Sequence, residues 1–140
     1  MVADLKFEEI KVGDTASFSK TVSEADVYAF AGISGDFNPI HVDAEFARGT
    51  RFGQRIAHGI LTASLVSTVI GTALPGKNTI YLSQDLRFVA PVFFGDTLTA
   101  MVKVAEILPA KRILVLETTV VNQHGKQVLT GQAKVMKQDG

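Results

Sequence analysis

Asp36 and His41 are the residues in this sequence whose types and spacing first suggest chemistry. They lie in the stretch GDFNPIHVD, and a carboxylate and an imidazole that face one cavity can hold a water between them. One group takes a proton from that water while the other gives a proton to a substrate. Histidine suits either task because it changes charge near neutral pH. The pair predicts acid-base catalysis, typically worth about 10²–10⁴ in rate.

The same stretch also has a purely structural interpretation, because Asp, Asn, Pro and Gly are turn residues. Asp36 can bond the amides of its neighbours, Asn38 can start a turn, and His41 can pack against a carbonyl. Pro39 fixes its own φ and restricts Asn38, so the link between acid and base is stiff in either case. The residues by themselves leave both interpretations open.

The stretch AHGIL, with His58 and Gly59, opens a long uncharged segment. We expect a helix over residues 59–72, whose first amides have no partner within the helix. Because Gly59 has no side chain to block a carbonyl, its amide and the helix dipole can stabilise an oxyanion. The alternative is that Gly59 only eases packing. For His58 the favoured interpretation is a local cap.

Ser67 and His124 carry weaker signals. A serine buried in a helix usually bonds back to the carbonyl four residues earlier, and the alternative is that Ser67 orients Asp36. His124 lies in a predicted hairpin turn and is assigned to the surface. The three histidines have no recognisable metal spacing, and no metal is predicted.

The segments before the long helix are marked by caps. We expect a strand over residues 14–21, followed by a helix that Ser23 caps and that ends near Gly35. Asp43 can cap a short helix over residues 44–47. These elements position the stretch that contains Asp36 and His41.

The long helix and the strands after it define the fold class. We expect protein to cover nearly all sides of the helix, and its small residues to let a sheet approach closely. These small residues are Ala63, Ser64, Ser67 and Gly71. From residue 78 onward alternating apolar residues, and a run rich in β-branched and aliphatic residues over 112–121, predict strands, with a bend near Pro91 and a hairpin turn at 122–125. The order predicts an α+β fold, an antiparallel sheet curled around one buried helix.

The composition fits one domain over residues 1–140, because 46% of the residues are hydrophobic. The 14 basic residues balance the 14 acidic ones, which argues against a general nucleic-acid binder. The lack of cysteine excludes disulfides and thiolate metal sites and suits a reducing cytoplasm. The N-terminus does not resemble a signal peptide, and the uncharged run over residues 56–76 is too polar for a membrane span.

The segment from Phe46 to Gln84 contains no Asp or Glu but holds Arg48, Arg51, Arg55 and Lys77. A local cationic field in a neutral protein suggests an anionic ligand. A solvated basic rim is the alternative.

Three stretches, SGDFNPIHVD, FGQRIAHGILTASLVS and LRFVAPVFFGDTL, resemble the MaoC-like (R)-specific enoyl-CoA hydratases. The resemblance extends over roughly residues 7–137 and implies the hot-dog fold, a curved antiparallel sheet wrapped around one long helix. The length and the stretch LPGKNTIYLSQ resemble the short bacterial hydratases that supply (R)-3-hydroxyacyl-CoA for polyhydroxyalkanoate synthesis.

The resemblance also assigns roles to residues. Asp36 and His41 match the catalytic pair, and Gly59 matches the glycine whose amide faces the thioester oxygen. Ser67 matches a serine near the aspartate and is expected, with Asn38, to support the pair.

The implied reaction is reversible (R)-specific hydration of trans-2-enoyl-CoA. The resemblance implies no metal or other cofactor beyond the coenzyme A of the substrate. It also implies a homodimer with substrate tunnels at the subunit boundary, and the composition predicts that this protein is cytoplasmic. An acyl-CoA thioesterase, an acyl-carrier-protein dehydratase and a non-catalytic acyl-CoA-binding module stay open as alternatives.

Overall fold

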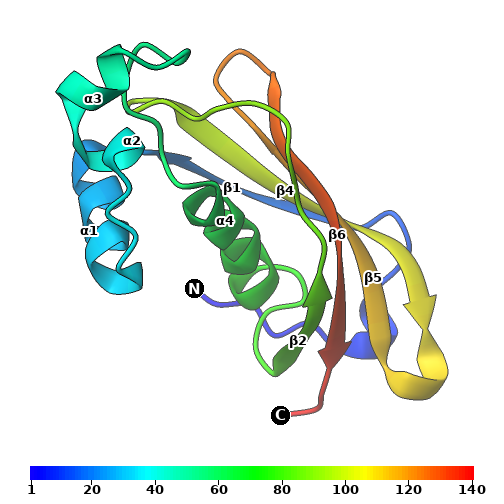
Figure 1. Cartoon of the computed structure of the whole chain (residues 1–140). Coiled ribbons are helices and arrows are strands. Elements are labelled where there is room, and N and C mark those ends of the chain that lie inside the picture. The colour runs from blue at the N-terminus through cyan, green and yellow to red at the C-terminus, as the bar shows by residue number, and fades with distance from the viewer.

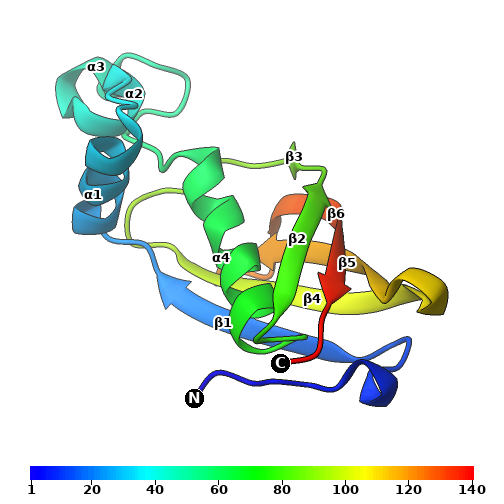
Figure 2. The same cartoon turned by 90° about the horizontal axis from the view of Figure 1, so that it is seen from below.

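The computed structural model describes residues 1–140 and is built on one curved antiparallel sheet (Figure 1). Its strands are β1 (Thr15–Thr21), β2 (Thr79–Gln84), β3 (Arg87–Phe88), β4 (Thr97–Leu108), β5 (Ile113–Val121) and β6 (Gln127–Lys137). They follow the order β1-β4-β5-β6-β2, and β3 also pairs with β6. One long helix, α4 (Gly59–Thr72), lies against the sheet (Figures 1 and 2). This confirms the predicted α+β hot-dog arrangement.

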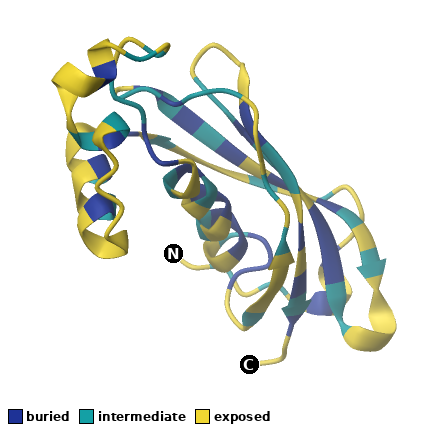
Figure 3. Ribbon diagram, in the orientation of Figure 1, coloured by how far each residue is buried: buried dark blue, intermediate teal, exposed yellow.

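Alternation of buried and outward-facing side chains along β4 builds much of the core (Figure 3), whereas β5 buries three consecutive residues, Leu114, Val115 and Leu116. In β4 four apolar residues are fully buried, and the residues between them, Thr99, Met101 and Lys103, face outward. The buried residues are Leu98, Ala100, Val102 and Val104. The hairpin predicted at 122–125 is also present, because the Asn122 amide donates to the Lys126 carbonyl and Gly125 has a positive φ of 74°. The period-two pattern therefore predicted β4 correctly, and the β-branched and aliphatic composition predicted β5.

Helix α4 begins and ends where the sequence predicted, but protein covers only one side of it. Its buried residues are Thr62, Leu65, Val66, Val69 and Ile70. Ser64, Ser67 and Gly71 lie on the exposed side, so the prediction that small residues face the sheet is wrong. The larger side chains face the sheet because burying them removes more apolar surface from water. One side of α4 is left open in the single chain.

Helix α1 (Glu24–Ser34) lies to one side of the sheet, joined to the end of β1 (Figure 1). Ser23 caps it as predicted, and the Asp26 side chain returns a bond to the Ser23 amide in a complete capping box. The helix ends at Gly35, whose φ of 81° favours a residue without a side chain. The residue that follows is Asp36.

Two short helices, α2 (Pro39–Val42) and α3 (Ala44–Arg48), follow α1. The cap of α3 is Asp43, as predicted, and its carboxylate accepts from the Phe46 amide at 3.0 Å. The sequence interpretation treated the α2 residues as a loop. A cap at Asn38 followed by proline at the first helical position is nevertheless a recognised helix start.

The segment Leu86–Phe94 is less regular than the expected strand, because only Arg87–Phe88 pairs in the sheet. Pro91 lies in the part that runs free of the ladder, as expected for a residue without an amide hydrogen. The remaining elements are two single-turn 3-10 helices, Phe7–Glu9 and Pro109–Lys111. None of the helices combines the length and the apolarity that crossing a bilayer requires.

Candidate active site

Asp36 directly follows α1 and is held by its own turn. Its amide donates to the Ser34 hydroxyl at 3.1 Å, and its Oδ1 accepts from the Asn38 amide at 3.1 Å. The expectation that Asp36 bonds its neighbours' amides is therefore confirmed. The turn uses one carboxylate oxygen and leaves Oδ2 available. That second oxygen faces His41.

His41 is buried on α2, and its ring is oriented by a backbone carbonyl. Nδ1 lies 2.7 Å from the carbonyl oxygen of Ile56, so Nδ1 carries the proton and Nε2 has a free lone pair. Asn38 supports this position, because its side chain accepts from the Ile40 amide at 3.2 Å and caps α2. The expected packing of His41 against a carbonyl occurs, and it leaves Nε2 free for chemistry.

The gap between the two groups is the main geometric feature of the site. His41 Nε2 and Asp36 Oδ2 are 4.0 Å apart. This separation exceeds a hydrogen bond, so the two groups do not satisfy each other directly. A small polar molecule that bonds to both fits such a gap better than direct contact does. The arrangement therefore suits the water-holding role predicted for the pair.

His58 comes from a different part of the chain and completes the cluster. Its Nε2 lies 2.9 Å from the backbone oxygen of Asp36, and its ring stacks on His41 with centroids 3.8 Å apart. It makes no side-chain cap bond, so the sequence interpretation of His58 as a local cap is wrong. No local signal links His58 to Asp36, since 22 positions separate them.

Gly59 is the first residue of α4, and its amide has no acceptor within the helix. A Cβ at this position would lie 2.7 Å from the Phe88 ring, so the close approach of Phe88 requires glycine. Gly59, Asp36, His41 and His58 all line one cavity of about 220 Å³. The structure thus brings together both members of the predicted pair and the predicted oxyanion donor.

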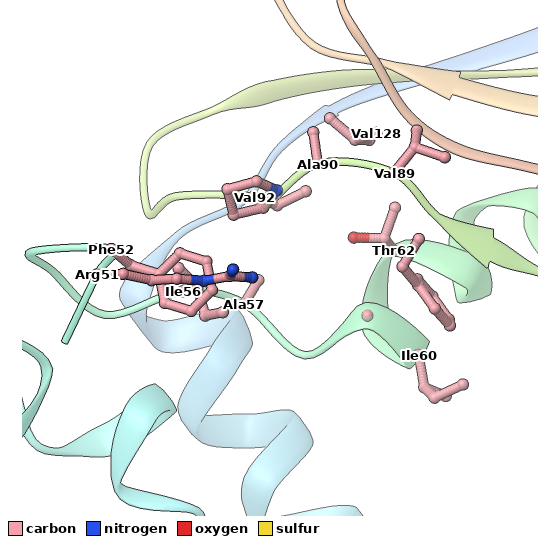
Figure 4. A pocket seen from close by; sticks show the side chains of 13 residues that line it. Arg51, Phe52, Ile56, Ala57, Ile60, Thr62, Val89, Ala90, Val92 and Val128 are labelled. Carbon is pink, nitrogen blue, oxygen red and sulfur yellow. The ribbon is translucent and has the colours of Figure 1, made fainter.

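A second, mostly apolar cavity of about 420 Å³ adjoins the first, and Gly59 and Ile60 line both. Figure 4 shows Arg51 on one side of it and Ile60 and Thr62 on the other. The Thr62 hydroxyl is buried and has no hydrogen-bond partner. The helix start therefore separates a small polar chamber from a larger apolar one, as a substrate with a polar reacting centre and a long chain requires.

Ser67 is not part of the polar cavity. It lies on the exposed side of α4, in a groove of about 370 Å³ that Tyr81 and Leu82 of β2 also line. It makes no hydrogen bond with Asp36, nor the default bond back to the carbonyl four residues earlier, within this chain. Phe30 and Ile60 line both this groove and the polar cavity.

The cationic segment is partly neutralised by acids from nearby elements. Arg48 pairs with Glu45, and Arg55 pairs with Glu24 at 2.6 Å. Arg51 has no such partner and lines the apolar cavity, with its guanidinium 4.9 Å from the centre of the Phe52 ring. Arg51 is therefore the residue of this segment that we expect to bind an anionic ligand at the apolar cavity.

Asp36, His41 and His58 also bring possible metal-ligand atoms within 4.8 Å of one another. The two imidazole planes are only 25° from parallel, so their in-plane lone pairs do not converge on one point as a tetrahedral site requires. The absence of a metal from the chemistry stays a prediction.

Comparison with known proteins places this geometry in context. The family model described as "MaoC like domain" matches residues 8–126. An (R)-specific enoyl-CoA hydratase of Rhodospirillum rubrum is 50% identical over 130 residues, 93% of this chain and 90% of the relative. A 3-hydroxybutyryl-CoA dehydratase of Methylorubrum extorquens is 47% identical over 94% of this chain and 83% of its own length. The unliganded R-hydratase PhaJ1 of Pseudomonas aeruginosa superposes with a TM-score of 0.94 at 45% identity, covering 99% of this chain and 89% of that one.

Proposed function

Because this chain belongs to the MaoC-like domain family, we propose that it catalyses (R)-specific hydration of trans-2-enoyl-CoA and the reverse dehydration. The observation that carries the proposal is the shared cavity. In it the Asp36 carboxylate and the His41 imidazole face each other across 4.0 Å beside the Gly59 amide. The pair and the amide supply the two things that the reaction needs, a proton relay and an oxyanion donor.

The reaction follows from this arrangement. The thioester oxygen accepts from the Gly59 amide, which draws electrons from the conjugated double bond and makes C3 electrophilic. A water held by Asp36 and His41 forms the bond to C3 and loses a proton to the pair, while C2 gains a proton from it. Because both groups lie on one side of the substrate, the addition is syn. The product is the (R) alcohol when the pocket presents the corresponding face of the double bond to the pair. The two residues act as one coupled unit.

The substrate's coenzyme A supplies the anionic group that the cationic segment suggests. Arg51 at the apolar cavity supports binding of a phosphate of coenzyme A. The proposed step uses only side chains and a backbone amide of this chain, so we propose no metal or other cofactor. A cytoplasmic location stays a prediction from the composition.

The proposal includes a homodimer, which two open surfaces support. β2 is an edge strand, and three consecutive residues on it, Ile80, Tyr81 and Leu82, are each at least 40% exposed. The open side of α4 lies across the groove from this strand. An exposed apolar edge favours pairing with another strand. That Ser67 supports the catalytic pair stays a prediction, to be tested in the homodimer.

The dimer is tested by placing a charge on the edge. Leu82→Lys should convert a dimer to a monomer in analytical ultracentrifugation, because a lysine opposes strand pairing. Ile33→Lys is the matched control, since Ile33 is 85% exposed on α1 and far along the chain from β2. A wild-type monomer, or a Leu82→Lys dimer, would contradict the proposed interface.

Crotonyl-CoA distinguishes the proposed function from its alternatives. Hydration removes the enoyl absorbance without releasing thiol, whereas a thioesterase releases free thiol. Chiral analysis of the product should give the (R) alcohol. A preference for an acyl-carrier-protein substrate would favour the dehydratase alternative, and binding without turnover would favour a non-catalytic module.

The catalytic pair is tested by two near-isosteric variants. Asp36→Asn and His41→Gln should each lower kcat by about 10²–10⁴ while the melting temperature changes little. Asp43→Asn is the control for Asp36→Asn, because asparagine keeps the cap of α3. Normal hydration rates in both variants would refute the mechanism.

A further inference from the structure

We propose that His58 is a positioning residue that holds Asp36 and His41 at their working separation; the proposal rests on the function given above. His58 is 3% exposed, and the reaction as derived does not use it. Three of its contacts nevertheless reach the proposed machinery. It bonds Asp36, stacks on His41 and directly precedes Gly59.

The first contact joins the acid to the long helix. The other hydrogen bonds of Asp36 come from its own turn, through Ser34 and Asn38. The Asp36 side chain is half exposed, so burial does little to hold it. The bond from His58 Nε2 to the Asp36 oxygen therefore ties this exposed turn to the start of α4. Since Gly59 is the next residue, the same bond sets the distance between the acid and the oxyanion donor.

The second contact fixes the ring of the base. The His41 and His58 ring centroids are 3.8 Å apart, and the Phe30 ring also contacts His58, with centroids 4.8 Å apart. Two different carbonyls fix opposite tautomers in the two rings. His41 donates from Nδ1 to Ile56, and His58 donates from Nε2 to Asp36. This leaves the His41 lone pair on Nε2, the atom that faces Asp36 Oδ2.

The unpartnered nitrogen of His58 distinguishes positioning from simple packing. Nδ1 is buried without a hydrogen-bond partner, which is unfavourable for a polar atom. An apolar side chain would fill the same space against Phe30 and His41 without that cost. A histidine at position 58 is explained if its Nε2 donor is needed for the hydrogen bond to the Asp36 carbonyl oxygen. A loss of that donor should shift the pair, and misplacement by about 1 Å can cost about 10² in rate.

Two substitutions separate the donor from the stacked ring. His58→Phe keeps a ring against His41 but removes the donor, whereas His58→Gln keeps an amide donor and removes the ring. We expect His58→Phe to lower crotonyl-CoA hydration kcat by about ten- to a hundredfold with KM within about threefold of wild type. His58→Gln should retain several times more activity than His58→Phe. The matched controls are His124→Phe and His124→Gln in the exposed hairpin, which should leave kcat unchanged.

Melting temperatures show whether each variant is folded. The ratio of kcat between the two variants shows whether the Nε2 donor or the stacked ring matters for the rate. Equal losses in both, or a folded His58→Phe with kcat within twofold of wild type, would overturn the proposal. If His58→Phe does not fold, His58→Gln is compared with wild type alone, and a loss beyond about tenfold would overturn it. Failure of the wild type to hydrate crotonyl-CoA would instead count against the proposed function.

An observation without substrate tests the link independently. Imidazole ¹⁵N spectra of the wild-type protein should show the proton of His58 on Nε2 and that of His41 on Nδ1. The His58 signal should shift in Asp36→Pro, which alters the backbone at the acceptor, and not in Asp43→Asn. The same tautomer in both rings would overturn the proposal, whatever the activity.

Discussion

The central sheet and the segment from Gly35 to Gly59 are held by different kinds of interaction. In the sheet, strand pairing and one continuous apolar cluster bury residues such as Leu116 completely. In the segment, side chains bond nearby backbone groups, and two of its four buried residues are His41 and His58. This difference indicates that the sheet provides most of the stability, whereas the segment positions the side chains of the candidate site. Substitutions in the two regions should therefore affect different measurements.

The largest effect is expected from a cavity in the sheet. Leu116→Ala removes a fully buried side chain from β5 and should cost about 2–5 kcal/mol of unfolding free energy. The kcat of the folded fraction should stay near wild type, because Leu116 lines neither cavity. Denaturant titration and steady-state kinetics provide the two measurements. Glu117→Ala, on the exposed face of the same strand, should stay within about 0.5 kcal/mol of wild type.

Gly59→Ala should produce the opposite pattern. The new Cβ would lie 2.7 Å from the Phe88 ring, so either the ring or the first turn of α4 must move. We expect kcat to fall by about ten- to a hundredfold with a smaller change in stability. Adding Phe88→Ala should restore part of the activity, since it removes the clash. Gly32→Ala is the control, because nothing lies within 4 Å of a Cβ there. An unchanged kcat in Gly59→Ala would show that the helix start does not need this contact.

Two capping residues sharpen the comparison within the segment itself. Asn38→Ala removes the cap of α2, the helix that carries His41, and Asp43→Ala removes the cap of α3. Each should cost about 1 kcal/mol of stability. Only Asn38→Ala should also lower kcat, by about tenfold, because α3 carries no residue of the polar cavity. Equal kcat values for the two variants would contradict the assignment of Asn38 as a support of the pair.

The smallest expected effect concerns α1, which leads into Asp36. The Ser23 amide holds the pKa of Asp26 below its ordinary value of 3.8. A lowered folded-state pKa contributes stability that is fully present above that ordinary value and is lost as the pH falls through the folded-state pKa. Asp26→Asn should therefore destabilise the protein by about 0.5 kcal/mol near neutral pH. The difference from wild type should disappear in thermal melts once the pH is below the folded-state pKa of Asp26. A difference that persists in acid would contradict this assignment.

Much of the fold follows from local patterns. Alternating apolar residues predicted the strands, and Ser23 and Asp43 predicted two helix starts because their bonds span only three residues. The uncharged run predicted α4 at its observed bounds. The side of α4 that faces the sheet was predicted wrongly. The larger apolar side chains mark the side that the sheet covers, so the sequence did contain this signal.

The candidate site divides in the same way. The sequence by itself determined that Asp36 is held by its own turn and that Gly59 stands at a helix start. Each of these features depends on neighbours only a few positions away. Only the tertiary structure decided that the carbonyl of Ile56 orients His41 and that His58 binds Asp36, across 15 and 22 positions. Backbone carbonyls look alike in every sequence, so a hydrogen bond to a distant one leaves no local signal. The partner of such a bond is selected by packing of the whole chain.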